Sequence, residues 1–167
     1  VNALSSHLRA EVHRDGKIHE QEYSRGKEAY AVREIGTSDN NGTTVEFQPD
    51  EQIFETLVYS YDTLADRMRE LAFLNQGLTI SLTDLRERVQ DEEGNDLGHL
   101  NETFYSTEGL KDFVGYLDSN REPLISEVIH VSGERNGVPV EVAMTYNTSF
   151  AENLFSYVNN INTHEGG

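Results

Sequence analysis

The chain contains no cysteine, and only three of its 167 residues are lysines: Lys17, Lys27 and Lys111. Without cysteine, neither a disulfide framework nor a thiolate metal site can form. No run of about 18 apolar residues is present, and residues 1–6 lack the basic and apolar regions of a signal peptide. With 36% hydrophobic and 26% charged residues, the composition lies in the globular range and predicts a cytoplasmic protein that folds in water.

Positive charge is scarce: the chain has 13 Lys and Arg residues and 30 Asp and Glu residues, which gives a formal net charge of -17. Non-specific DNA binding draws its affinity from many Lys and Arg contacts to phosphate, so little direct DNA binding by this segment is expected. Two interpretations of the acidity stay open. It aids solubility, or the source organism lives in high salt, where screening weakens the repulsion between carboxylates.

Alternation and turn residues predict a β-rich N-terminal part. Apolar and charged residues alternate over residues 8–13, and Asp15-Gly16 supplies a turn that favours positive φ, which predicts a hairpin. A loosely extended stretch is expected over residues 26–35. After a polar break, a second strand is expected over residues 43–48, where Val and Phe alternate with Thr and Glu.

The middle of the chain predicts two helices and a strand. A helix is expected up to residue 75, with Asp62 as its N-cap. The period switches to two after Gly77, and the charged stretch 84–101 is expected to be a solvated hairpin tip. A short helix is expected over residues 110–117. The first helix rests on four apolar residues at helical spacing, namely Leu64, Met68, Leu71 and Leu74.

The C-terminal part begins with β-rich runs at 127–132 and 138–146, which Asn136-Gly137 joins into a predicted hairpin. Alternation over residues 154–160 predicts a final extended segment. A domain boundary is expected near residue 120, which separates residues 1–120 from residues 121–167. Strands mixed with segregated helices, without an internal repeat, predict an α+β fold.

Several stretches resemble the ATPase subunits of bacterial type II DNA topoisomerases. The nine-residue blocks RMRELAFLN and NNINTHEGG are the most specific, and RELAFLN is more typical of the DNA gyrase B family than of topoisomerase IV. The remaining blocks follow in the order of that family, so the resemblance covers nearly the whole chain. The stretches are VNALS (1–5), RDGKI (14–18), GTTVEFQPD (42–50), RMRELAFLN (67–75), EVA (141–143) with Tyr146-Asn147, and NNINTHEGG (159–167).

The resemblance implies the C-terminal part of a gyrase/MutL-type (GHKL) ATPase domain at residues 1–120. The start of a transducer domain, with a ribosomal protein S5 domain 2-like fold, is implied at residues 121–167. ATP and Mg²⁺ are the implied cofactors, DNA gyrase A and DNA the implied partners, and the ATPase domain is expected to self-dimerise. The glutamate that activates water, the Mg²⁺ ligand and the phosphate lid are expected before Val1. Hence we expect no catalytic residue in this chain and no ATP turnover by the segment alone.

Four residues are candidate ligand contacts because they match the family's motifs. Thr43 matches a threonine on the floor of the adenine site, where a hydroxyl can donate and accept through an ordered water. Gly42 precedes it, and Val45 is expected on the same side of the strand as an apolar wall. Arg14 matches an arginine that aminocoumarin inhibitors contact. Without the resemblance, Gly-Thr-Thr-Val indicates a turn into a strand, and Arg14 a solvated arginine beside Asp15.

Other polar clusters are interpreted as structural. His13 with Glu11, and His164 with Glu165, lack a specific spacing such as HExxH, so no bound metal is predicted. The acidic stretch 91–96 lacks the ligand alternation of an EF-hand and is expected to be a solvated insertion.

On the helix that ends at residue 75, Arg67, Arg69 and Glu70 could clamp a phosphate, but a solvated face over a core stripe is expected. No G-x-S-x-G sequence supports a serine hydrolase. Two alternatives to a gyrase-type protein stay open: the topoisomerase IV paralogue, and a non-catalytic acidic interaction module with the same fold.

Overall fold

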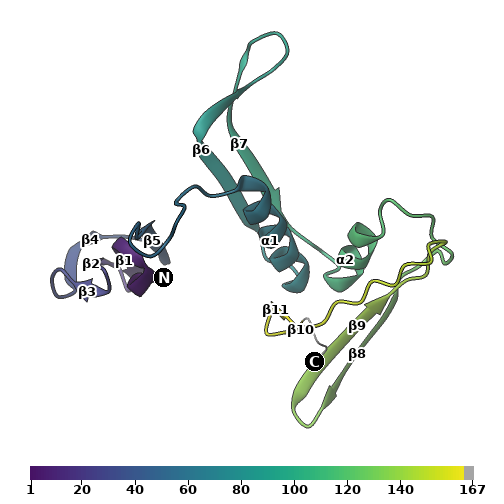
Figure 1. The fold of residues 1–167 in the computed structure, drawn as a ribbon. Coiled ribbons are helices and arrows are strands. Elements are labelled where there is room, and N and C mark those ends of the chain that lie inside the picture. The colour runs from purple at the N-terminus through teal and green to yellow at the C-terminus, as the bar shows by residue number, and fades with distance from the viewer. Residues whose placement is uncertain (164–167) are drawn as a thin grey trace. The chain divides into compact units, whose positions relative to one another are not determined.

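The computed structural model describes residues 1–163 and divides the chain into two compact units, Val1–Tyr59 and Ser60–Gly167 (Figure 1). The first unit is built from strands, and both α-helices belong to the second. This mixture confirms the predicted α+β class. No helix in the described chain is long and apolar enough to span a membrane.

The first unit is an antiparallel five-stranded sheet with the order β3-β2-β1-β5, in which β4 also pairs with β2. Asp15 (φ 54°) and Gly16 (φ 77°) form the left-handed turn between β1 and β2, as predicted, because Asp and Gly tolerate that conformation. The loosely extended stretch at 26–35 contains two short strands instead. The strands are β1 (Ser5–Arg14), β2 (Lys17–Ser24), β3 (Lys27–Glu28), β4 (Arg33–Thr37) and β5 (Gly42–Pro49), and a 3₁₀ turn, Asn2–Leu4, precedes them.

Strand register gives this sheet one apolar face and one charged face. Leu8 on β1 lies opposite Phe47 on β5, and the pairs Ala10–Val45 and Val12–Thr43 follow along the same two strands. Directly opposed residues point to the same side of a sheet, so these side chains share one face. The alternate positions form the other face, which is rich in Arg and Glu.

The second unit begins with α1 (Tyr61–Leu74), whose N-cap is Ser60. The prediction of Asp62 as N-cap was wrong, because the Ser60 hydroxyl accepts the Thr63 N–H at 3.3 Å and the helix starts earlier. Asp62 instead lies in the first turn, where its negative charge faces the positive end of the helix dipole. The core under α1 is small. It consists of Ala65, Ala72 and Phe104, with Tyr61, Met68, Ile80 and Leu82 packed against them.

The stretch 84–101 belongs mainly to a long hairpin of β6 (Ile80–Gln90) and β7 (Asp96–Phe104), so the prediction of one solvated tip was wrong over most of its length (Figure 1). Charged side chains are compatible with the outer part of this hairpin because most of its residues are exposed, whereas Ile80, Leu82 and Phe104 at its base pack under α1. Only residues 91–95 form the tip. There the Asp91 carboxylate accepts the backbone N–H groups of Glu93 and Asn95.

The second predicted helix is confirmed as α2 (Leu110–Leu117), and Phe113 on it stacks on Phe73 of α1 at 5.2 Å between ring centroids. The predicted hairpin across Asn136-Gly137 is confirmed as β8 (Ile129–Arg135) and β9 (Val138–Met144).

The predicted extended segment 154–160 is corrected. It ends in a tight hairpin of β10 (Tyr157–Val158) and β11 (Ile161–Asn162), because Asn159 and Asn160 both adopt positive φ. The domain boundary near residue 120 stays a prediction, since the division between the two units falls after Tyr59.

Candidate functional site

Strand β5 carries three of the four candidate residues, and it lies at the edge of the sheet, where it pairs only with β1 among the described strands. Thr43 lies opposite Val12, and Val45 lies opposite Ala10, so both candidate side chains point to the apolar face. Val45 is 52% exposed. The Thr43 hydroxyl has no hydrogen-bond partner within residues 1–163 and is therefore free to contact a ligand.

Gly42 starts this strand opposite His13. A Cβ atom built on Gly42 would meet no atom within 4 Å. The start of β5 is therefore open on this side within the described residues.

Arg14 is the last residue of β1 and alternates onto the same face as Val12. Its side chain is 78% exposed, and its Nε lies 3.6 Å from the equally solvated carboxylate of Asp15. A contact of this kind between exposed groups holds the guanidinium only weakly. The structure thus brings Arg14, Thr43 and Val45 to one face of the sheet and leaves the arginine free to reorient.

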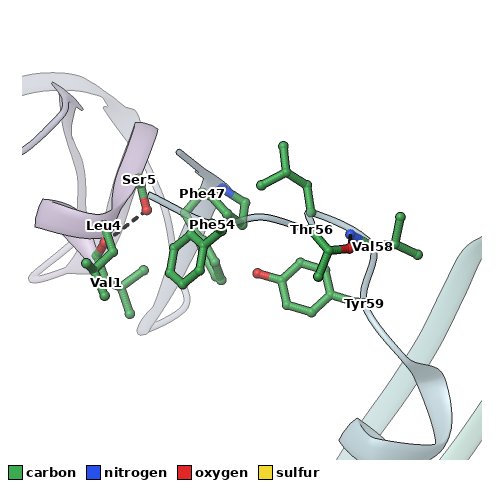
Figure 2. Close-up of a pocket in the computed structure, with 10 residues that line it drawn as sticks. Val1, Leu4, Ser5, Phe47, Phe54, Thr56, Val58 and Tyr59 are labelled. Carbon is green, nitrogen blue, oxygen red and sulfur yellow. Dashed lines mark hydrogen bonds between the residues drawn. The ribbon is translucent and has the colours of Figure 1, made fainter. Parts of the chain in front are cut away.

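A hollow with a volume of about 220 Å³ lies beside Phe47 of β5 (Figure 2). Phe47, the next residue on the same face, lines it together with Leu4, Phe54 and Tyr59. The hydroxyl of Ser5 donates to the Val1 carbonyl at 2.9 Å and fixes the N-terminal side of the hollow. Sequence patterns alone did not predict this feature. The sequence signal for it is the segment 53–59, which is rich in apolar residues and lies outside any predicted strand or helix.

On the opposite face, His13 lies between two side chains. Its Nε2 is 2.7 Å from Glu11 Oε1, and its Nδ1 is 2.9 Å from the Ser38 hydroxyl. This arrangement ties the loop after β4 to β1. Within residues 1–163 no three His, Asp or Glu side chains stand together as a metal-ligand set. The pair His164 and Glu165 lies outside the described residues.

The arginines of α1 are engaged within the second unit. Arg69 donates to Asp66 and Glu102, both at 2.8 Å, and lies over the ring of Phe104 at 5.2 Å. Arg67 pairs with Glu70 one turn along the helix. The structural interpretation of this face fits these contacts, although Arg69 is more enclosed than a solvated side chain, with 23% of it exposed.

Solved structures define the class of fold. The chain resembles the 43K ATPase domain of Thermus thermophilus gyrase B, crystallised with an aminocoumarin, at a TM-score of 0.81 and 30% identity, over 99% of this chain and 43% of that one. Gyrase B of Myxococcus xanthus has the same fold, with a TM-score of 0.81 at 23% identity over 97% of this chain and 45% of that one.

Sequence comparison then gives the family. A family model described as DNA gyrase B matches residues 109–167. The chain is 55% identical over its full length to DNA gyrase B of Eisenibacter elegans and 51% identical to that of Cytophaga hutchinsonii, and it spans 34% of each. It is 49% identical to DNA gyrase B of Halalkalibacterium halodurans, of which it spans 25%.

The chain is similar over its whole length to DNA gyrase B proteins, as its resemblance predicted, and it spans between a quarter and about a third of the length of these curated relatives. These relatives are all gyrase proteins, so neither the topoisomerase IV paralogue nor a non-catalytic interaction module is favoured.

Proposed function

We propose that this chain serves in the ATP-hydrolysing subunit of a type II DNA topoisomerase, which couples ATP binding and hydrolysis to DNA strand passage and negative supercoiling. The observation that carries the proposal is the match of the whole chain, at 55% identity, to a DNA gyrase B protein. In this role residues 1–120 complete the ATPase domain, and residues 121–167 begin the transducer domain.

In this proposal β5 supplies one wall of the nucleotide pocket. Adenine presents a donor beside an acceptor, and the Thr43 hydroxyl can serve either group, directly or through an ordered water. Val45, on the same face of the strand, packs against the apolar ring, and Gly42 lets the ligand or a neighbouring segment approach the start of β5. The free Thr43 hydroxyl and the exposed Val45 side chain support this assignment.

Arg14 is the proposed inhibitor contact and has no catalytic role. The crystallised relative from Thermus thermophilus is bound to an aminocoumarin. Arg14 shares the face of Thr43 and Val45, and its guanidinium carries donors in a planar fork that suits oxygen-rich ligands.

The remaining parts of the chemistry come from outside these residues. From the resemblance to gyrase ATPase subunits, Mg²⁺ is proposed to be held by ATP and by residues outside this segment. A net charge of -17 disfavours phosphate backbones, so DNA is held by other parts of the enzyme and by DNA gyrase A. The assembly is cytoplasmic and dimerises through its ATPase domains, and this segment alone does not turn over ATP.

The test is supercoiling of relaxed plasmid by the full-length protein reconstituted with its partner subunit. ATP-dependent negative supercoiling is expected, with no supercoiling when a non-hydrolysable analogue replaces ATP in a multi-turnover assay. Decatenation without supercoiling would favour a topoisomerase IV function instead. Absence of any ATP-dependent change in DNA topology would overturn the proposal.

A further inference from the structure

The two most specific sequence blocks meet in the folded chain. Arg67, the first residue of RMRELAFLN, donates from Nη2 to the backbone carbonyl of Asn160 at 2.7 Å. Asn160 in turn donates from Nδ2 to the Oδ1 of Asn75, the last residue of the same block, at 2.9 Å. One turn residue of the β10–β11 hairpin is therefore held at two points along α1 and its C-cap (Figure 1).

The hairpin cannot define its own position. Its two strands are two residues long, and an isolated hairpin of that size is at best marginally stable in water. Its turn residues Asn159 (φ 49°) and Asn160 (φ 64°) adopt a left-handed conformation that asparagine tolerates but does not enforce. Contacts with other elements must hold it in place.

Those contacts come from the two helices. The ring of Tyr157 lies 6.1 Å from that of Phe113 on α2. Tyr157 is half-buried, and burial raises the pKa of its hydroxyl, which a hydrogen bond to Glu70 on α1 raises further. The position of the hairpin therefore depends on its contacts with α1 and α2.

A hydrogen bond within α1 holds the side-chain amide of Asn75 in place. Its Nδ2 donates to the Leu71 carbonyl at 2.7 Å and thereby caps the end of α1. With its donor engaged there, Oδ1 is left to accept from Asn160. The end of the helix thus sets where Asn160 can lie.

We propose that Arg67, Asn75 and Asn160, here called the α1 latch, are positioning residues that make the β10–β11 hairpin follow the movement of α1. This inference rests on the proposed function. The helix begins at Tyr61 and is the first element after β5, which carries the proposed nucleotide contacts. The α1 latch then joins the β10–β11 hairpin to the helix that directly follows this strand in the chain.

The test compares Asn160→Gly with Asn159→Gly in the full-length protein reconstituted with its partner subunit. Glycine keeps the left-handed turn in both variants, but only the first removes the donor to Asn75. Asn159 is exposed and serves as the matched control. The measured quantities are the ATPase rate, the ATP consumed per supercoil introduced, and the hydrogen exchange of the Thr163 amide, which bonds to Ser156 at 2.8 Å.

For Asn160→Gly we expect an ATPase rate close to wild type and about fivefold more ATP consumed per supercoil, the factor that one hydrogen bond is worth. Thr163 exchange should rise by a similar factor. Unchanged coupling and exchange in Asn160→Gly would overturn the inference, as would equal effects in the control. A parallel loss of ATPase and supercoiling would also overturn it, because the contact would then be only structural. If the wild-type protein fails to supercoil, the proposed function is wrong. The hydrogen exchange of Thr163 still tests whether the α1 latch holds the hairpin.

Discussion

Arg9 on β1 donates its Nε–H to the carboxylate of Glu20 on β2 at 2.7 Å, and only 5% of Glu20 is exposed. Arg33 and the Tyr30 hydroxyl donate to the other carboxylate oxygen at 2.7 and 2.8 Å. These bonds, from Arg33 first, then Tyr30 and Arg9, lower the pKa of Glu20 to about 2. One carboxylate therefore joins β1, β2, the start of β4 and the segment that leads into β4.

The first prediction concerns pH. The folded pKa of Glu20 lies below its unfolded value, so its stabilising contribution is present above an unfolded pKa of about 4.5 and is lost as pH falls toward about 2. Glu20→Gln should remove this loss and lower stability at neutral pH, because Arg9 and Arg33 lose their charged acceptor. Hydrogen exchange of the β2 amides, followed between these pH values, measures the change in stability. Glu46→Gln, an exposed change on β5, is the control, and equal behaviour of the two variants would contradict the prediction.

The second prediction concerns the nucleotide. Thr43→Ala should raise the dissociation constant of a non-hydrolysable ATP analogue for the full-length protein about fivefold to tenfold, because one polar contact to the base is lost. Thr44→Ala is the matched control, since Thr44 lies opposite Glu11 and its side chain points to the other face. Calorimetric titration gives both dissociation constants. Equal weakening in both variants would mean that the strand, and not its apolar face, is what the substitution disturbs.

The third prediction concerns inhibition. Arg14→Gln should raise the aminocoumarin concentration needed for half-inhibition by about tenfold, the loss of a charge-assisted contact, while the KM for ATP stays unchanged. Arg135→Gln is the control, because Arg135 also ends the first strand of a hairpin before a left-handed turn, at Asn136-Gly137. The ATPase assay with increasing inhibitor measures both variants. An unchanged inhibitor response in Arg14→Gln would remove the assignment.

The fourth prediction concerns the net charge of -17. Raising KCl from about 0.1 M to about 1 M shortens the Debye length from about 10 Å to about 3 Å, which weakens repulsion among surface carboxylates. The melting temperature of the protein should therefore rise with KCl. Sucrose at matched osmolarity separates screening from general solute exclusion. A melting temperature that stays level in KCl would count against adaptation to high salt.

Local sequence patterns were sufficient where the chain interacts with its near neighbours. Asp15-Gly16 and Asn136-Gly137 predicted their hairpins, because the left-handed turn is a property of those residues. The apolar residues from Leu110 to Leu117 recur at helical spacing and therefore predicted α2. The start of α1 was misplaced because Ser60 and Asp62 are both good N-caps, and only the path of the chain before the helix decides between them.

The sequence by itself determined the class of fold, the similarity to DNA gyrase B proteins and the choice of β5 residues proposed to meet a nucleotide, since these depend on period and on ordered motifs. Only the tertiary structure decided that Glu20 is buried among Arg9, Arg33 and Tyr30, and that Asn160 lies against α1. Strand register and helix packing bring together residues as far apart as Arg67 and Asn160. No local pattern carries that information, because the free energy that selects such contacts comes from elements distant in the chain.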